Sequence, residues 1–241
     1  MKFNRLERKV YKMCKSKDTS TLTEENINDM IVGTSNEFAH ALSLGIIETP
    51  GIYNVAYLYG VSGTGKTYML HAIRNGIIKT HSDKTVCYKT GSEMVEEIRE
   101  ATSIGIEDLI EKYIRIDVLL LDDIQFLLGR GRSNTELVFL QILKHMRVND
   151  KQIVVACDRH FSVMETVYPL KILGEQGINA DLDLPDYEMR KSFLLKKIEQ
   201  KWNGYTFSME EIDCIARKPE TNYFELEGAL IKMMAKKQIN E

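Results

Sequence analysis

An eight-residue segment from Gly60 to Thr67 constrains the fold of this 241-residue chain more than any other feature of its sequence. It reads Gly-Val-Ser-Gly-Thr-Gly-Lys-Thr and fits the pattern G-x-x-x-x-G-K-[ST]. A short apolar run, 55–59, precedes it, and a helical pattern over about 66–79 follows it. Glycines permit the tight turn that lets backbone N–H groups converge on a phosphate, and the helix N-terminus adds partial positive charge. The segment therefore predicts a strand–loop–helix unit that binds phosphate.

The chemistry expected of this loop is that of a magnesium-bound nucleoside triphosphate. Lys66 is predicted to bridge the β- and γ-phosphates, and the Thr67 hydroxyl is predicted to ligate Mg²⁺. The predicted nucleotide-binding residues of the loop are Gly60, Ser62, Gly63, Thr64, Gly65, Lys66 and Thr67.

Acidic residues follow two other predicted strands. Asp122 and Asp123 come directly after the apolar run 118–121, and Asp158 follows the run 153–157. In open α/β sheets, ligands lie outside the carboxyl ends of the strands. We therefore predict that Asp122 holds the magnesium, directly or through water. Asp123 is predicted to orient or activate the attacking water and is, with the loop lysine, a predicted catalytic residue. Asp158 is predicted to sense the γ-phosphate.

Helix and strand patterns alternate from Thr34 to about Pro185. The predicted strands are 55–59, 85–88, 117–121, 153–157 and 178–184, and the later predicted helices are 66–79, 91–101, 106–114 and 133–147. Before the first strand, Ser35 is predicted to cap a helix whose apolar positions include Phe38 and which ends near Pro50. This alternation indicates a parallel sheet with helices on both faces.

The two ends of the chain differ from this α/β core. After Pro185 the pattern predicts three helices, 187–202, 208–217 and 223–238, with Ser208 and Glu211 in a capping-box spacing. At the start, an apolar stripe is surrounded by seven basic residues, which predicts a solvated helix or a docking arm; the stripe is Phe3, Leu6, Val10 and Met13. The predicted division is a basic amphipathic arm and linker over 1–22, a nucleotide-binding core over 23–185 and a helical subdomain over 186–241.

Composition excludes several classes of protein. The formal charge is −3, whereas a dedicated non-specific DNA coat is usually basic. None of the four cysteines forms a C-x-x-C pair, which disfavours zinc and disulfide frameworks and fits a reducing cytoplasm. No apolar run is long enough to span a membrane, and the start of the chain does not look like a secretory signal. We therefore expect a cytoplasmic protein with no membrane partner.

Taken together, these motifs resemble the ATPase domain of the bacterial DnaA family of replication initiators. Ile31–Ala41 resembles the start of the family's AAA+ domain, Leu121–Leu127 its Walker B segment, Gln152–Arg159 its sensor 1 strand and Glu225–Leu230 the motif in its lid helices. The resemblance extends over about residues 28–238. It implies an α/β fold: a P-loop AAA+ core with a parallel five-stranded sheet flanked by helices, followed by a small three-helix lid subdomain.

The resemblance also implies ligands and partners. It implies ATP and Mg²⁺ as cofactors, with the adenine contacted by Ile31 and Val32. It implies a helix pair at about 92–113 that contacts single-stranded DNA. It further implies assembly with copies of itself or with related proteins when ATP is bound.

The sequence departs from the family pattern at two arginine positions. Leu173 stands where the family has its arginine finger, and Phe224 stands where it has the sensor 2 arginine. Because an arginine finger accelerates hydrolysis about 10³–10⁵-fold in GTPases, slow turnover is expected. The family's helix-turn-helix domain, which binds duplex origins, is expected to be absent because the sequence ends directly after the lid.

Three functions remain open at this point. The first is an ATP-binding protein of replication initiation or its regulation, whose partner is a replication initiator or the replicative helicase. The second is a DnaC-type helicase loader ATPase. The third is a non-enzymatic regulator that caps an initiator filament.

Overall fold

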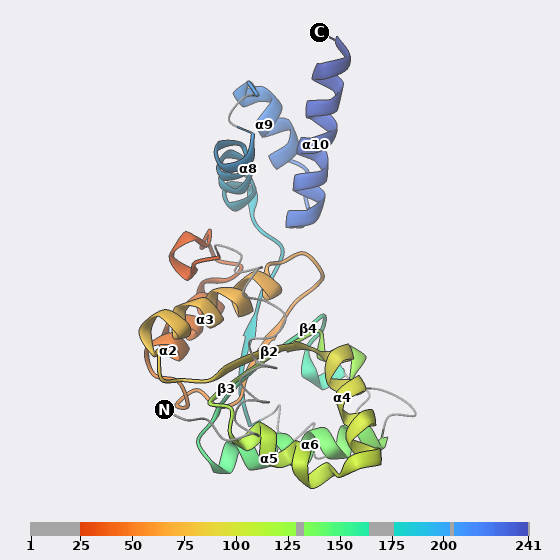
Figure 1. Cartoon of the computed structure of the whole chain (residues 1–241). Helices are drawn as coiled ribbons and strands as arrows, with labels where there is room; N and C mark the ends of the chain where they lie inside the picture. The colour runs from red at the N-terminus through yellow and green to blue at the C-terminus, as the bar shows by residue number, and fades with distance from the viewer. Residues whose placement is uncertain (1–24, 129–132, 164–175, 203–204, 241) are drawn as a thin grey trace.

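The computed structural model describes residues 25–128, 133–163, 176–202 and 205–240, and its centre is a sheet of five parallel strands (Figure 1). The strands are β1 (Ala56–Tyr59), β2 (Val86–Thr90), β3 (Val118–Asp122), β4 (Gln152–Cys157) and β5 (Ile178–Asp181). Their order is β2-β3-β4-β1-β5, with Leu58 of β1 opposite Ala156 and Ala180. The predicted fold class is confirmed. The order also places the segment after β1 beside the carboxyl end of β4 and one strand away from that of β3.

Helices cover both faces of the sheet. The helices are α2 (Glu37–Glu48), α3 (Lys66–Thr80), α4 (Gly91–Ile104), α5 (Ile106–Ile114) and α6 (Ser133–Val148), with short 3-10 turns η1 (Ile27–Asp29), η2 (Ile124–Phe126) and η3 (Phe161–Val163). Leu119 and Leu121 of β3 point into the core beneath α4, α5 and α6, whereas Val118 and Leu120 point into the core beneath α2 and α3. This period of two with both faces buried explains why the strands are continuous apolar runs in the sequence.

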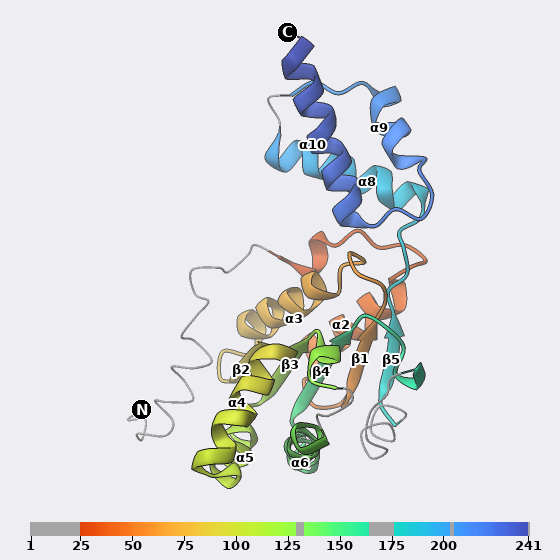
Figure 2. The same ribbon diagram turned by 90° about the vertical axis from the view of Figure 1, so that its right-hand side faces the viewer.

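Three further helices lie together beyond the carboxyl end of the sheet, at the top of Figures 1 and 2. They are α8 (Tyr187–Lys201), α9 (Met209–Ala216) and α10 (Tyr223–Asn240), and they surround an apolar cluster of their own that includes Leu194 and Leu230. The predicted capping box is present at the start of α9, where Ser208 and Glu211 bond each other's backbone N–H groups. We call α8–α10 the lid.

The predicted start of the first long helix is wrong by one residue. Asn36, not Ser35, lies at the N-cap of α2, and its side chain turns back to the preceding segment instead of capping the helix. Its Oδ1 accepts from the Gly33 N–H at 3.0 Å, and its Nδ2 donates to the Ile31 carbonyl at 2.9 Å. Of the apolar positions of this predicted helix, Phe38 is 53% exposed, whereas Leu42 and Ile46 are buried.

Two sequence predictions fall outside the described residues: the amphipathic arm over 1–22 and the arginine-finger position at Leu173. In the described part of the chain, no helix combines the length and the apolar character needed to cross a membrane.

Candidate nucleotide-binding site

The glycine-rich loop joins β1 to α3 in a backbone conformation that depends on glycine. Gly63 and Gly65 have φ values of +79° and +101°, in the left-handed region that other residues rarely adopt. The Gly60 N–H donates to the Cys157 carbonyl at 3.3 Å, which ties the loop to the end of β4. Thr64 is buried and its hydroxyl donates to the Val61 carbonyl at 3.0 Å, whereas Ser62 at the tip is exposed. The glycines therefore allow the tight turn that leads from β1 into the start of α3.

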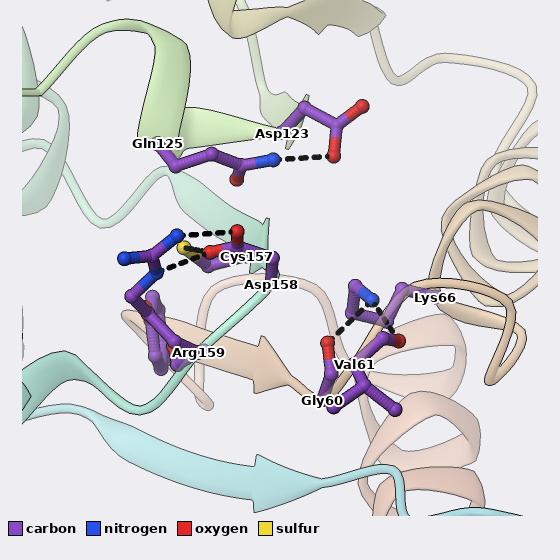
Figure 3. Close-up of polar contacts among 9 residues, drawn as sticks. Gly60, Val61, Lys66, Asp123, Gln125, Cys157, Asp158 and Arg159 are labelled. Atoms are coloured by element: carbon purple, nitrogen blue, oxygen red, sulfur yellow. Dashed lines mark hydrogen bonds and ion pairs between the residues drawn. The ribbon is translucent and has the colours of Figure 1, made fainter.

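Lys66, the first residue of α3, points back into this turn (Figure 3). Its Nζ donates to the carbonyls of Gly60 and Val61 at 2.7 and 2.8 Å, and neither partner carries a charge. Lys66 is only 7% exposed. Burial lowers the pKa of its ammonium, whereas the negative charges of Asp122 and Asp123 raise it, and burial is the larger effect. The first turn of α3 holds no acidic residue and has no side-chain cap. A buried cation therefore lies at an uncapped helix N-terminus, an environment that favours an anion.

Asp122 ends β3 with its carboxylate held by three hydrogen bonds. The Thr67 hydroxyl donates to Oδ2 at 2.6 Å, the Tyr88 hydroxyl donates to the same oxygen at 3.0 Å, and the Asp123 N–H donates to Oδ1 at 2.9 Å. Asp122 is buried, whereas Thr67 is exposed. Burial raises the pKa of Tyr88, with the Asp122 carboxylate adding to the effect, so the phenol stays a donor at neutral pH. The two residues predicted to hold magnesium are thus in direct contact.

The backbone turns at Asp123, the residue directly after β3. Its φ is +52°, in the left-handed region that residues other than glycine adopt uncommonly and that occurs at functional sites. Its Oδ1 accepts from Nε2 of Gln125 at 2.9 Å (Figure 3). Gln125 was not anticipated from the sequence. Its place two residues after the paired aspartates is the signal that points to it.

The carboxylate of Asp158, which directly follows β4, is hydrogen-bonded to the next residue in the chain, Arg159. Arg159 donates from Nε and Nη2 to the two carboxylate oxygens, each at 2.7 Å. This guanidinium lowers the pKa of Asp158. Figure 3 shows the pair across the site from Lys66. In this structure the Asp158 carboxylate is therefore paired with the guanidinium of Arg159.

The lid reaches the loop through the start of α10. The Tyr223 N–H donates to the Gly63 carbonyl at 3.0 Å, and a Cβ atom added to Gly63 would lie 2.8 Å from Asn222 Cγ and 2.9 Å from Phe224 Cδ2. Phe224, the residue at the predicted sensor 2 position, is therefore beside the loop, with 70% of its surface exposed.

The predicted adenine-contacting segment lies at the other border between core and lid. Ile31 and Val32 precede α2, and the Ile31 carbonyl is held by Asn36. A Cβ atom added to the adjacent Gly33 would lie 2.5 Å from Sδ of Met189 on α8. Ile31 and Val32 thus begin a segment that packs against the lid.

Known proteins are similar to this chain in sequence and in structure. The sequence profile of the bacterial DnaA ATPase domain matches residues 22–172. The chromosomal replication initiator protein DnaA of Lachnoclostridium phytofermentans is 37% identical over 211 residues, which are 85% of this chain and 46% of that protein. The chain thus spans about half the length of this relative.

Solved structures give the same result. Domain III of the Thermotoga maritima replication initiation protein DnaA matches with a TM-score of 0.81 at 29% identity, covering 90% of each chain. A replication initiator DnaA bound to AMPPCP and single-stranded DNA matches with a TM-score of 0.78 at 28% identity, covering 88% of this chain and 65% of that chain. The DnaC helicase loader is 12% identical, with a TM-score of 0.56 over 68% of this chain and 98% of that chain, so that likeness shows the fold alone.

Proposed function

Because the chain belongs to the family of bacterial DnaA ATPase domains, we propose that it binds ATP with Mg²⁺ at Gly60–Thr67 and acts in the initiation of DNA replication or in its regulation. The observation that carries this proposal is the environment of Lys66. Its buried ammonium is bonded to two neutral carbonyls at the start of a helix without an acidic first turn. A triphosphate would supply the negative charge that these groups lack.

The residues near the loop also fit a divalent cation. Thr67 and Asp122 present hydroxyl and carboxylate oxygens, the ligand types that Mg²⁺ prefers. Bound magnesium neutralises negative charge on the phosphates. Thr67 and Asp122 would hold the ion, and Lys66 would contact the phosphates. Asp123 would orient the attacking water, with its carboxylate positioned by Gln125.

We expect hydrolysis to be slow. The first turn of α10 contains Phe224 and Glu225 and no basic residue. Arg190, on α8, donates to the backbone carbonyls of Pro185 and Ala216 and is buried there. Neither α10's first turn nor Arg190 therefore places a guanidinium at the loop, and stabilisation of developing phosphate charge would rest on Lys66 and the bound metal.

Charge favours a protein as the partner. The segment 92–113, which spans most of α4 and α5, contains seven acidic residues against two basic ones. Glu97 is paired with Lys89 and Lys112, and the other six acidic residues are exposed, with Arg99 as the one exposed basic residue of the segment. Such a surface repels a phosphate backbone. We therefore propose that the partner is a replication initiator or the replicative helicase, and that this helix pair does not bind single-stranded DNA.

Isothermal titration with ATP and with ADP, in Mg²⁺, tests nucleotide binding. Lys66→Ala should weaken ATP binding by about 10- to 100-fold, the effect of losing a hydrogen bond to a charged group of about 1.5–3 kcal/mol. The matched control is Lys79→Ala, which removes an exposed lysine from the last turn of the same helix. Asp123→Asn should keep ATP binding and abolish any residual hydrolysis. Failure of the wild-type protein to bind ATP at millimolar concentration would end this proposal.

A further inference from the structure

Among the described residues, Tyr88 is the one bonded to the Asp122 carboxylate that belongs neither to the glycine-rich loop and its helix nor to the Asp122–Asp123 pair. It lies on β2, next to β3 in the sheet, with Tyr88 opposite Leu120 in the register. Its hydroxyl donates to Asp122 Oδ2 at 3.0 Å, the oxygen that also accepts from Thr67. The phenol therefore approaches the carboxylate from a second strand, while the threonine approaches from α3.

The ring of Tyr88 is itself held in place. It is partly buried against the core beneath α2 and α3, and it stacks on the imidazole of His71 with ring centroids 4.5 Å apart and planes 29° apart. His71 lies four residues after Thr67 on α3, so both side chains lie on the same face of that helix. Because stacking fixes the ring, the position of the hydroxyl is determined by the packing of β2 against α3.

The hydrogen bonds determine which part of the carboxylate faces the site. A carboxylate has about four acceptor positions, and the three described bonds occupy two on Oδ2 and one on Oδ1. Loss of the Tyr88 bond would leave Oδ2 with Thr67 alone and allow the carboxylate to rotate. Outer partners of this kind orient a ligating carboxylate and influence metal affinity.

We propose that the Tyr88 hydroxyl is a positioning residue for the magnesium-binding carboxylate of Asp122, and that it contributes to affinity for the metal more than to affinity for the nucleotide. The proposal rests on the function proposed above. It assigns a role to an uncharged residue on a strand that contributes no other group to the site.

Tyr88→Phe tests this inference, because it keeps the ring and its stacking and removes one oxygen atom. The affinity for ATP is measured in EDTA and across a series of Mg²⁺ concentrations, and binding of Mn²⁺ to the protein–ATP complex is followed by the loss of the free-ion electron paramagnetic resonance signal. We expect unchanged ATP affinity in EDTA, and a metal concentration for half-maximal effect that is higher by about tenfold or more.

The matched control is Tyr68→Phe, which removes the same atom from a partly buried tyrosine of α3 whose hydroxyl donates to the Asn26 carbonyl at 3.0 Å. It should leave both quantities unchanged. A Tyr88→Phe metal midpoint equal to that of the wild type overturns the inference and leaves the proposed function intact. Equal losses of ATP affinity with and without metal indicate a structural role and also overturn it. A wild-type protein that binds ATP without any effect of Mg²⁺ overturns both this inference and the proposed metal site.

Discussion

The contact between Gly63 and the lid gives a prediction that a single methyl group can test. Gly63 adopts a φ of +79°, and a Cβ atom there would lie 2.8 Å from Cγ and Oδ1 of Asn222 and 2.9 Å from the Phe224 ring. Asn222 in turn caps α10, because its Oδ1 accepts from the Glu225 N–H at 2.9 Å. Gly63→Ala must therefore move the cap and the first turn of the lid helix.

The expected cost follows from the contacts that are disturbed. A left-handed conformation costs a residue with a Cβ atom about 1–2 kcal/mol. Loss of the Asn222 cap costs about 0.5–2 kcal/mol, and loss of the Tyr223 N–H bond to the Gly63 carbonyl costs about 0.5–1.5 kcal/mol. The last two contributions act on the lid, so the start of α10 should lose about 1–3 kcal/mol of protection against opening.

Gly65→Ala is the matched control. Gly65 has a φ of +101°, so alanine there is also strained, but the nearest atom to an added Cβ is Met30 Cε at 3.7 Å, which is ordinary contact. Both variants should lower the free energy of unfolding in urea. Only Gly63→Ala should accelerate hydrogen exchange at the amides of Tyr223 and Glu225, by about 5- to 150-fold. Equal exchange at these two amides in both variants would refute the idea that Gly63 supports the lid.

Three further predictions concern other parts of the molecule. Ser208→Ala should lower the free energy of unfolding of the lid by about 1 kcal/mol, because it removes the N-cap of α9. The measurement is the fluorescence of the single tryptophan, Trp202, which packs on the lid cluster. The control Ser92→Ala, at an exposed position in α4, should have little effect. Because burial lowers the pKa of Lys66 below its ordinary value of 10.5, the unfolded chain keeps this proton over a pH range in which the folded chain has released it. The free energy of unfolding of the wild type relative to Lys66→Met should therefore rise with pH between those two pKa values, and a fall would contradict the assigned burial. Fluorescence anisotropy with oligo-dT in ATP and Mg²⁺ should show binding weaker than about 10⁻⁴ M at physiological salt; tighter, salt-dependent binding that is lost in Arg99→Ala would show that the acidic helix pair does contact DNA.

Sequence reasoning succeeded where a local pattern has a single physical solution. The apolar runs that became β3 and β4 are buried on both faces, so no other element suits them. The loop from Gly60 to Thr67 is similarly constrained by its glycines and its lysine. The error at Ser35 and Asn36 has a different cause. Both residue types favour the start of a helix, and the Asn36 side chain turned back to Gly33 and Ile31, contacts that no local pattern predicts.

The contacts that complete the site were not predictable because they join residues far apart in the chain. Tyr88 meets Asp122 only because β2 and β3 are neighbours with Thr90 opposite Asp122. A one-residue change of register would turn Tyr88 to the other face of the sheet, away from α3. Asp158 and Arg159 are adjacent in sequence, yet nothing in that spacing indicates that the arginine would bind both carboxylate oxygens.

The contact between Gly63 and the lid indicates how a phenylalanine at position 224, in place of an arginine, affects closure of the lid. Gly63 is joined to α10 by a backbone hydrogen bond and by the side chains of Asn222 and Phe224, all of which are uncharged. An arginine at position 224 would be drawn to phosphate charge over a distance, whereas a phenyl ring contributes only where it touches. Closure of this lid should therefore depend on its fit against the glycine-rich loop more than on the number of phosphates bound. On this reasoning the ratio of ATP to ADP affinity, measured in the wild type and in Phe224→Arg, should be larger in the variant.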